Sequence, residues 1–391
     1  MNQRISHTQL TALIWAAMLA PAAELLPAIT LPAGGKGAWL APVAAIPLVL
    51  LSGELLGRLS REGGLARGLC HRLGPVLGGG TLLIYMVWAL VLLALRLRLC
   101  AQRLLSTGYR DGALWYFLLA VAAVALWLGV GHLPALARTG QIFLAILLVT
   151  GGIVLLLSLG RVRPERVLPL WLEDVGPVLV SGLPAAGALG WGIWGAFLAG
   201  QLKPAEGRGR WYGRFWGAGG CLLLALAQWV VLGNLGPALA GRLDDPFFAL
   251  AKSVGIEGAF QRVESVIVAV WTLADLILAA LLLFSLRKGA ECVPLFKERD
   301  RQTAATALLL AVVLALGLFS RERAVRWSRE VVPWVNLLLA LGIPVAVNLL
   351  GAILGKGEER ADVVVKKGGK VADIVVEKDV EKKGEKSKKR C

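Results

Sequence analysis

The sequence has few charged residues for its length. Only 17% of its 391 residues are Asp, Glu, Lys or Arg, whereas 57% are hydrophobic and the mean hydropathy is +0.68. Soluble globular proteins contain about 25% charged and about 45–50% apolar residues, so a chain with the present balance cannot bury its apolar surface in water. The composition excludes a soluble enzyme, a disordered chain and a disulfide-rich secreted module. It indicates an integral membrane protein.

Residues that commonly carry chemistry are also scarce. The three histidines lie far apart, and the five cysteines are isolated, without CxxC spacing, so neither a disulfide framework nor a metal site is expected. The sequence has no Ser/His/Asp set and no phosphate loop of the Walker type. We therefore expect no catalytic role and no cofactor. The cysteines are Cys70, Cys100, Cys221, Cys292 and Cys391.

The formal net charge of +16 does not indicate a nucleic-acid partner. Most of the Lys and Arg residues lie in short segments between apolar runs or in the last 36 residues, and no helix-turn-helix or zinc motif accompanies them. Basic segments beside apolar runs are typical of contact with anionic lipid headgroups. The lipid bilayer is therefore the partner that the charge distribution predicts.

The chain contains ten apolar runs long enough to cross a bilayer as helices, which takes about 17–25 residues each. The first run is too long for a signal peptide and is interpreted as a retained span. Residues 1–355 are thus predicted to form one all-α transmembrane domain, followed by a Lys- and Glu-rich, disordered tail at 356–391. The predicted spans are 9–31, 38–57, 77–97, 112–131, 139–159, 175–200, 214–240, 262–286, 303–319 and 331–354.

The distribution of Lys and Arg predicts the orientation of these spans. With ten spans both termini lie on one side, and the segments on that side, including the tail, hold 27 Lys and Arg against 15 on the other. Cytoplasmic segments carry the excess of positive charge in membrane proteins. We therefore expect both termini to be cytoplasmic.

Glycine and proline fall at matching positions of the two five-span halves. Span 1 carries Pro21 between Ala20 and Ala22, and span 6 contains a glycine-rich stretch. Interrupted helices at corresponding positions of two repeats indicate a midplane binding site in transporters. The alternative is that the small residues serve only close helix packing. The stretch in span 6 runs from Gly182 to Gly195 and includes Gly187, Gly190 and Trp191.

Glu24, Glu54 and Asp275 are carboxylates within the predicted spans, and an ionisable residue there is by default a candidate functional group. Glu24 follows the proline of span 1 and is interpreted as functional, whereas Glu54 lies near the end of span 2 and is interpreted as structural. For Asp275, near the middle of span 8, a functional role and a structural role as the partner of an arginine are equally consistent with the sequence.

Span 3 adds polar and aromatic groups. Arg96, Arg98 and Arg103 lie towards its end, where we expect their side chains to extend to the membrane interface. Tyr85 and Trp88 lie within the span. They are candidates to face a ligand, although aromatic side chains in helices more often serve packing.

Several short motifs, in order and at matching spacing along roughly residues 4–355, resemble a known family. The chain is similar to the B subunits of spore germinant receptors (the GerAB type), a branch of the amino acid–polyamine–organocation transporter superfamily. The motifs are Ile5-Ser6, Gln9-Leu10, Leu26-Pro27, Gly35–Trp39, Leu168–Trp171, Gly176-Pro177, Asp245–Phe248, Gln261–Ser265 and Val270-Trp271.

The resemblance implies ten helices in two inverted five-helix repeats, with helices 1 and 6 broken around a ligand pocket. It also implies a receptor in the spore inner membrane that senses a small nutrient, commonly an amino acid, together with an A subunit and a lipoprotein C subunit. Carried to this sequence, the pocket positions are Ala20, Pro21, Ala22, Tyr85, Trp88, Gly187, Gly190, Trp191 and either Thr272 or Asp275.

The sequence departs from the family pattern at several of these positions. Relatives often have Gly-x-Gly in place of Ala20-Pro21-Ala22, an acidic residue at Gly37 and a Lys near Leu278, and Asp275 is unusual. Two added methyl groups leave less room beside the backbone, which favours a small amino acid as ligand.

Two functions compete at this point. In the first, a bound nutrient biases the conformation of the chain and thereby the partner subunits. In the second, the chain is a secondary transporter, proton-coupled through Glu24 or Asp275. A purely structural scaffold for other membrane subunits is a third interpretation.

Overall fold

The computed structural model describes residues 4–108, 112–168, 170–203, 209–253, 263–292 and 300–353, and their regular structure is almost wholly helical. The chain divides into two units, Met1–Pro344 and Val345–Cys391. Of the second unit only residues 345–353, part of the last helix, are described. The all-α prediction is confirmed, whereas the prediction for the tail at 356–391 lies outside the described residues.

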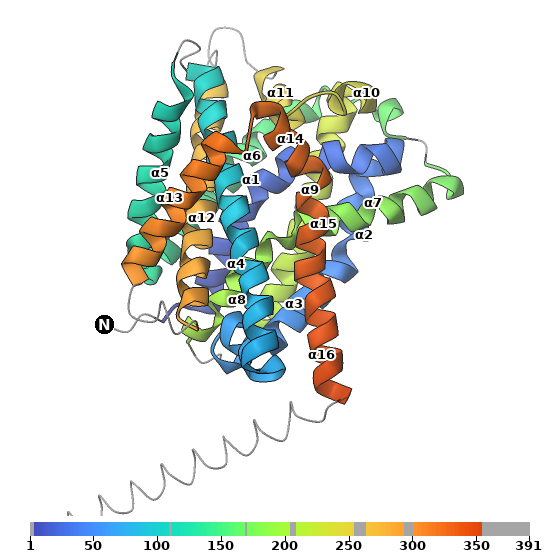
Figure 1. Ribbon diagram of the computed structural model, residues 1–391. Coiled ribbons are helices and arrows are strands. Elements are labelled where there is room, and N and C mark those ends of the chain that lie inside the picture. The colour runs from blue at the N-terminus through green and yellow to red at the C-terminus, as the bar shows by residue number, and fades with distance from the viewer. Residues whose placement is uncertain are drawn as a thin grey trace, which may run out of the picture. The chain divides into compact units, whose positions relative to one another are not determined.

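The helices follow one another with short connections (Figure 1). They are α1 (His7–Gly34), η1 (Gly35–Leu40), α2 (Ala41–Ala44), α3 (Ile46–Leu59), η2 (Ser60–Glu62), α4 (Leu65–Gly108), α5 (Leu114–Val130), α6 (Leu133–Leu159), η3 (Pro164–Arg166), η4 (Leu172–Asp174), α7 (Val175–Ala188), η5 (Gly190–Gly192), α8 (Ile193–Phe197), η6 (Ala199–Gln201), α9 (Gly209–Leu235), α10 (Pro237–Ala240), α11 (Pro246–Ser253), α12 (Val263–Ala290), α13 (Asp300–Gly317), α14 (Arg321–Glu330), α15 (Val332–Leu337), η8 (Leu338–Gly342) and α16 (Ile343–Ile353).

Seven of the described helical segments are long and apolar enough to cross a membrane, or eight if the bent pair α13 and α14 is one span. The chain is therefore a multi-pass membrane protein, with fewer clear spans than the ten predicted runs. Three features account for the difference between ten and seven. The helices from His7 to Glu62 are continuous enough to count once, α5 has only 17 residues, and α13 and α14 qualify only as a bent pair. A helix nevertheless lies within each of the ten runs.

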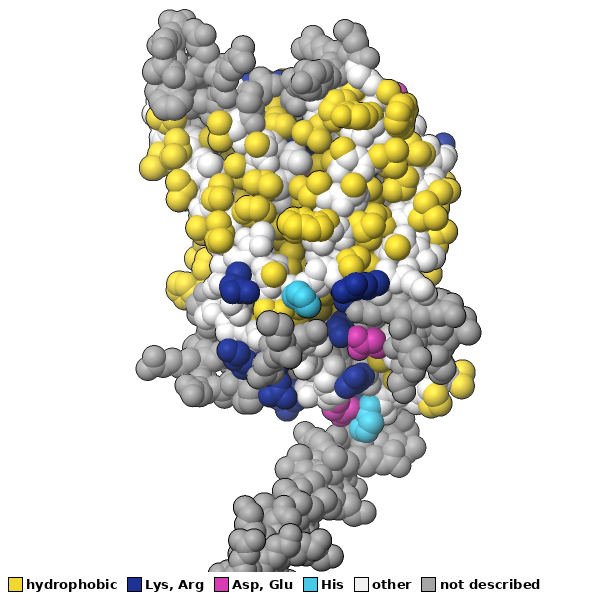
Figure 2. All heavy atoms as spheres, turned by 90° about the vertical axis from the view of Figure 1, so that its left-hand side faces the viewer, with side chains coloured by type: hydrophobic (Ala, Val, Ile, Leu, Met, Phe, Trp, Pro, Cys, Tyr) yellow, Lys and Arg dark blue, Asp and Glu magenta, His cyan; other side chains and the backbone are white. Residues whose placement is uncertain are grey.

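Helices α1 and α12 form the centre of the first unit. Helix α1 packs against α6, α7, α9 and α12, and α12 packs against α4 and α5. Apart from Glu24 on α1 and Asp275 on α12, their middle parts are apolar on every side, which is typical of a helix surrounded by other helices. Helices α5 and α6 instead expose large apolar side chains such as Trp127 and Leu156. Figure 2 shows a broad band of hydrophobic side chains on the side formed by α5 and α13, as expected for a surface that faces lipid.

The two predicted helix interruptions have different outcomes. Helix α1 continues through Pro21, so the break expected there is wrong. A proline removes only one hydrogen bond, the flanking alanines favour the helix, and membrane helices tolerate the loss. In the second half, α7 ends at Ala188 and a tighter turn at Gly190–Gly192 precedes α8. The chain thus leaves α-helical geometry at the predicted glycines.

The N-terminal segment is fastened to the end of this interrupted stretch. The N–H of Ile5 donates to the carbonyl of Gln201 at 2.9 Å, and the N–H of Lys203 donates to the carbonyl of Ile5 at 2.9 Å. Ile5 is fully buried. These two backbone bonds hold the start of α1 against the segment that follows η6.

Candidate ligand site

Two arginines of α4 face the centre of the molecule. Arg96 and Arg103 are seven residues apart, or about two helical turns, and therefore lie on one face of the helix. Their side chains are only 5% and 9% exposed. The prediction that they extend to the membrane interface is wrong, because two carboxylates from neighbouring helices hold them inside.

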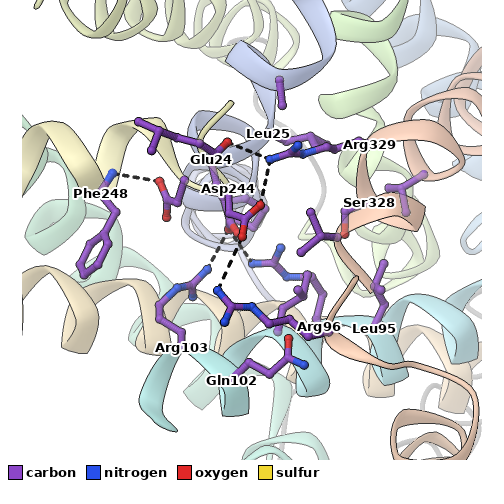
Figure 3. Close-up of a pocket in the computed structure, with 18 of the residues that line it drawn as sticks. Glu24, Leu25, Leu95, Arg96, Gln102, Arg103, Asp244, Phe248, Ser328 and Arg329 are labelled. Atoms are coloured by element: carbon purple, nitrogen blue, oxygen red, sulfur yellow. Dashed lines mark hydrogen bonds and ion pairs between the residues drawn. The ribbon is translucent and has the colours of Figure 1, made fainter. Parts of the chain in front are cut away.

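The carboxylates are those of Glu24 on α1, which Figure 3 shows beside Arg96 and Arg103, and of Asp275 on α12. Arg103 donates to Asp275 at 2.6 Å and to Glu24 at 2.8 Å. The Nε of Arg96 donates to the same Asp275 carboxylate at 3.1 Å, and its Nη2 lies 3.6 Å from Glu24. Asp275 is 2% exposed. We call these four residues the charge quartet.

The quartet carries two positive and two negative charges, so its formal charge is zero. Taking ions out of water costs several kcal/mol each, and only close ion pairs with good hydrogen bonds offset that cost. Removing one member leaves an uncompensated buried charge, which costs about 3–5 kcal/mol. The quartet thus fixes α1, α4 and α12 to one another more firmly than an exposed set of ion pairs would.

A cavity of about 390 Å³ lies beside the quartet. Its walls come from α1, the second half of α4, α11 and α14, and from Trp191 in η5. Three of the predicted site residues, Pro21, Glu24 and Trp191, meet in it, and Asp275 lies directly behind Arg96 and Arg103. Trp191 is only 2% exposed. It lines the cavity, and its buried indole N–H is a donor without a partner among the described residues, which favours an acceptor such as a ligand oxygen.

Another wall of the cavity carries charges that were not predicted from the sequence. Asp244 accepts from Arg329 at 3.3 Å and lies 3.6 Å from Arg321. These two arginines come from α14, and both line the cavity. Together with Arg96, Arg103 and Lys252 they give the lining five cations, against the carboxylates of Glu24, Asp244 and Asp245.

Asp245 also lines the cavity, and its pKa is shifted from the ordinary value. Its carboxylate accepts the N–H of Phe248 at 2.9 Å and so caps the start of α11. Burial, together with the negative charge of Glu24, raises the pKa of Asp245 to about 7, although Arg103 opposes the shift. The cavity therefore has a carboxyl group that changes charge near neutral pH.

Four predicted site residues lie in a different helix contact. The hydroxyl of Tyr85 donates to the carbonyl of Leu339 at 2.6 Å, and the indole N–H of Trp88 donates to Asn336 at 2.9 Å. Gly187 and Gly190 face the backbone of α15, where an added Cβ would meet Pro333 or Asn336. These four residues pack α4, α7 and η5 against α15 and η8, outside the cavity lining.

The remaining predicted site residues also lie outside the larger cavity and serve helix packing. Ala22 is fully buried, and the Thr272 hydroxyl donates to the carbonyl of Val268 within α12 at 2.8 Å. Ala20 lines a separate apolar cavity of about 70 Å³ beside Trp271. Among the described residues no group of three or more His, Cys, Asp or Glu side chains could hold a metal ion.

The spacing of Arg96 and Arg103 is the signal through which the sequence could have revealed the quartet. Two arginines seven residues apart inside an apolar helix present both charges to one neighbour. Glu24 and Asp275 were the intramembrane carboxylates available to pair with them. The charges of Asp244, Arg321 and Arg329 give no such signal, because they lie in short segments between spans.

Comparison with known proteins places the chain in a family and a fold class. A family model described as "Spore germination protein" matches residues 4–324. Among solved structures, MhsT in complex with L-phenylalanine matches with a TM-score of 0.62 and 13% identity, covering 85% of this chain and 87% of that one.

A second similar structure is Mhp1, a nucleobase-cation-symport-1 family transporter in a closed conformation with bromovinylhydantoin bound. It matches with a TM-score of 0.55 and 12% identity, covering 90% of this chain and 94% of that one. The fold is thus the LeuT-like fold of membrane transporters. None of the curated protein sequences compared with the chain is significantly similar to it.

Proposed function

We propose that this chain, which belongs to the spore germination protein family, binds a small nutrient molecule in the cavity beside Glu24 and Trp191. The ligand is an amino acid, and its binding is passed to A and C partner subunits in the spore inner membrane. In this proposal the helices form two inverted repeats of five, with both termini in the cytoplasm. The similarity to a structure that holds L-phenylalanine supports an amino-acid ligand.

The observation that carries the proposal is a cavity of about 390 Å³ lined by Trp191, whose buried indole N–H has no partner among the described residues. Sites for small molecules are commonly about 300–1,000 Å³, with a few polar groups on largely apolar walls. Trp191 lies in the short turn η5, where the helical run departs from α-geometry. A ligand carboxylate that accepts this N–H would lie near Arg96 and Arg103, whose charges favour it.

Signalling requires that the ligand prefer one conformation of the chain. A ligand shifts an equilibrium only by its difference in affinity between two states. The cavity is lined by α1 and α4, which belong to long membrane spans, and by α11 and α14, which are shorter helices. A molecule that contacts both sets of helices stabilises the arrangement in which they close on it.

Thermal unfolding of the purified chain with a panel of amino acids tests the proposal. We expect at least one amino acid to raise Tm, and Trp191→Phe to weaken that ligand about fivefold, since one hydrogen bond is worth about 1 kcal/mol. The matched control is Trp127→Phe, because Trp127 is exposed on α5 and is not part of the cavity lining. Absence of stabilisation by every amino acid, or equal effects of the two substitutions, would refute the proposed site.

A coupled secondary transporter is the second candidate, favoured by Asp245. Glu24 and Asp275 are both held by arginines, whereas Asp245 has a raised pKa of about 7 and can exchange a proton near neutral pH. Counterflow of labelled amino acid in proteoliposomes that is lost in Asp245→Asn would support transport. Binding without any flux would support the sensor.

A further inference from the structure

A second polar cavity lies about 18 Å along α12 from Asp275, at the end of that helix. It encloses about 150 Å³ between the turn that joins α5 to α6, the end of α12, the start of α13 and η6. The proposed ligand site makes no use of it, and the two cavities share no lining residue.

The described lining of this cavity is basic. It contains Arg287, Lys288, Arg301 and His132, and no carboxylate is among the described residues that line it. Arg287 is held in position, since it donates to the carbonyl of Gly129 at 2.5 Å and lies 4.7 Å from the centre of the Phe284 ring. Lys288 forms an ion pair with Glu291, which stands outside the lining. The fixed charge that faces the cavity is positive.

The backbone adds to this charge. His132 and Leu133 line the cavity at the N-terminus of α6, a helix of 27 residues. No side chain caps this end, but Pro134 has no N–H and the N–H of Ala135 donates to the carbonyl of His132 at 2.9 Å, so Leu133 supplies the amide of this first turn that can face a ligand. This amide and the positive end of the helix dipole together favour an anion.

The cavity also lies at the level of lipid headgroups. Arg287 and Lys288 are in the last turn of α12, at the end of a candidate membrane span. Figure 2 shows Lys, Arg and His side chains gathered directly below the hydrophobic band on the side formed by α5 and α13. A site here is within reach both of lipid phosphates and of phosphate compounds dissolved in the adjoining water.

We infer that this cavity is a binding site for a phosphate group. Three cationic side chains and a helix N-terminus surround a space that admits a tetrahedral anion, and phosphate oxygens are strong acceptors for such donors. Gln201 also lines the cavity, and its carbonyl accepts the N–H of Ile5. A bound phosphate joins α6, α12 and α13 to η6 and stabilises the contact that fastens the N-terminal segment.

The experiment uses the full chain in lipid nanodiscs and measures Tm through its tryptophan fluorescence. One arm compares pure phosphatidylcholine with a mixture that contains phosphatidylglycerol. The other adds millimolar inorganic phosphate to phosphatidylcholine discs, with chloride at equal ionic strength as reference. The test variant is Arg301→Gln, and the matched control is Arg138→Gln, which removes the same charge from an exposed arginine of α6 outside the lining.

We expect a rise of Tm in at least one arm for the unmodified chain and for Arg138→Gln. In Arg301→Gln the apparent affinity for the stabilising anion falls about tenfold, the usual effect of losing one charged hydrogen bond. A rise only with phosphatidylglycerol identifies a lipid headgroup, and a rise with inorganic phosphate identifies a soluble phosphate compound. No rise in either arm, or the same loss in both variants, overturns the inference. Lys288→Gln repeats the test if Arg301→Gln fails to fold.

Discussion

Neutralising Asp275 should destabilise the chain strongly. Asp275→Asn keeps the size of the side chain but removes the negative charge to which both Arg96 and Arg103 donate. Glu24 then remains as the only carboxylate of the quartet, so two buried guanidinium groups share one counter-charge. The formal charge of the quartet changes from zero to +1 in a region where its side chains are at most 18% exposed.

The size of the effect follows from this burial. Breaking a buried ion pair by removing one partner costs about 3–5 kcal/mol. Adding Arg103→Gln removes the stranded charge, and residues in one network commonly show coupling energies of about 0.5–3 kcal/mol. We therefore expect the double variant to lose less free energy of unfolding than the two single variants lose in sum.

The free energy of unfolding in detergent micelles, measured for the unmodified chain, both single variants and the double variant, checks this reasoning. Glu54→Gln is the matched control, since Glu54 pairs with two arginines that are 50% and 55% exposed and exposed pairs contribute at most about 1 kcal/mol. If Asp275→Asn destabilises the chain no more than Glu54→Gln does, or if the double variant shows no coupling, the quartet does not hold these helices together.

Two further predictions concern the wall of the cavity and the helix packing beside it. Because the folded-state pKa of Asp245 is raised to about 7, its contribution to stability is lost as the pH rises from about 4 to about 7, and Asp245→Asn should flatten this dependence in a pH series of Tm measurements. An unchanged profile would contradict the assigned pKa. Gly187→Ala places a methyl group on the Pro333 carbonyl of α15 and should cost about 1–3 kcal/mol in the same unfolding assay, whereas Gly53→Ala on α3, with open space around it, should be neutral or stabilising. Equal effects of the two alanines would contradict the close contact of α7 with α15.

The helical framework could be predicted from the sequence because it depends on local properties. Runs of apolar residues specify membrane helices wherever they reach the thickness of the bilayer. The departure from α-geometry at Gly190–Gly192 was likewise predictable, since glycine lowers the cost of other backbone conformations. Pro21 shows the limit of such reasoning. A proline weakens a helix locally, but the surrounding helices decide whether it breaks.

The site was less predictable because it depends on which faces of distant helices meet. Tyr85 and Trp88 were reasonable candidates for a ligand pocket, yet their polar atoms bond to η8 and α15 more than 240 residues away. Tyr85 lies 11 residues before Arg96 and 18 before Arg103, close to whole numbers of helical turns, so the three residues lie on one side of α4 at different levels. The neighbours at each level decide their roles, and the pairing of the arginines with the carboxylates of α1 and α12 is a property of the folded chain.

Glu24 connects the two parts of the site, because it lines the cavity and also belongs to the quartet. Under the proposed function, the ammonium group of an amino acid competes with Arg103 for this carboxylate. Any movement of Glu24 towards the ligand weakens the bond that joins α1 to α4, while Asp275 continues to hold Arg103 to α12. Ligand binding would then loosen α1 against a fixed α4–α12 pair. A sensor requires this kind of coupling, because the free energy of ligand binding changes the position of one helix and does not move the ligand across the membrane.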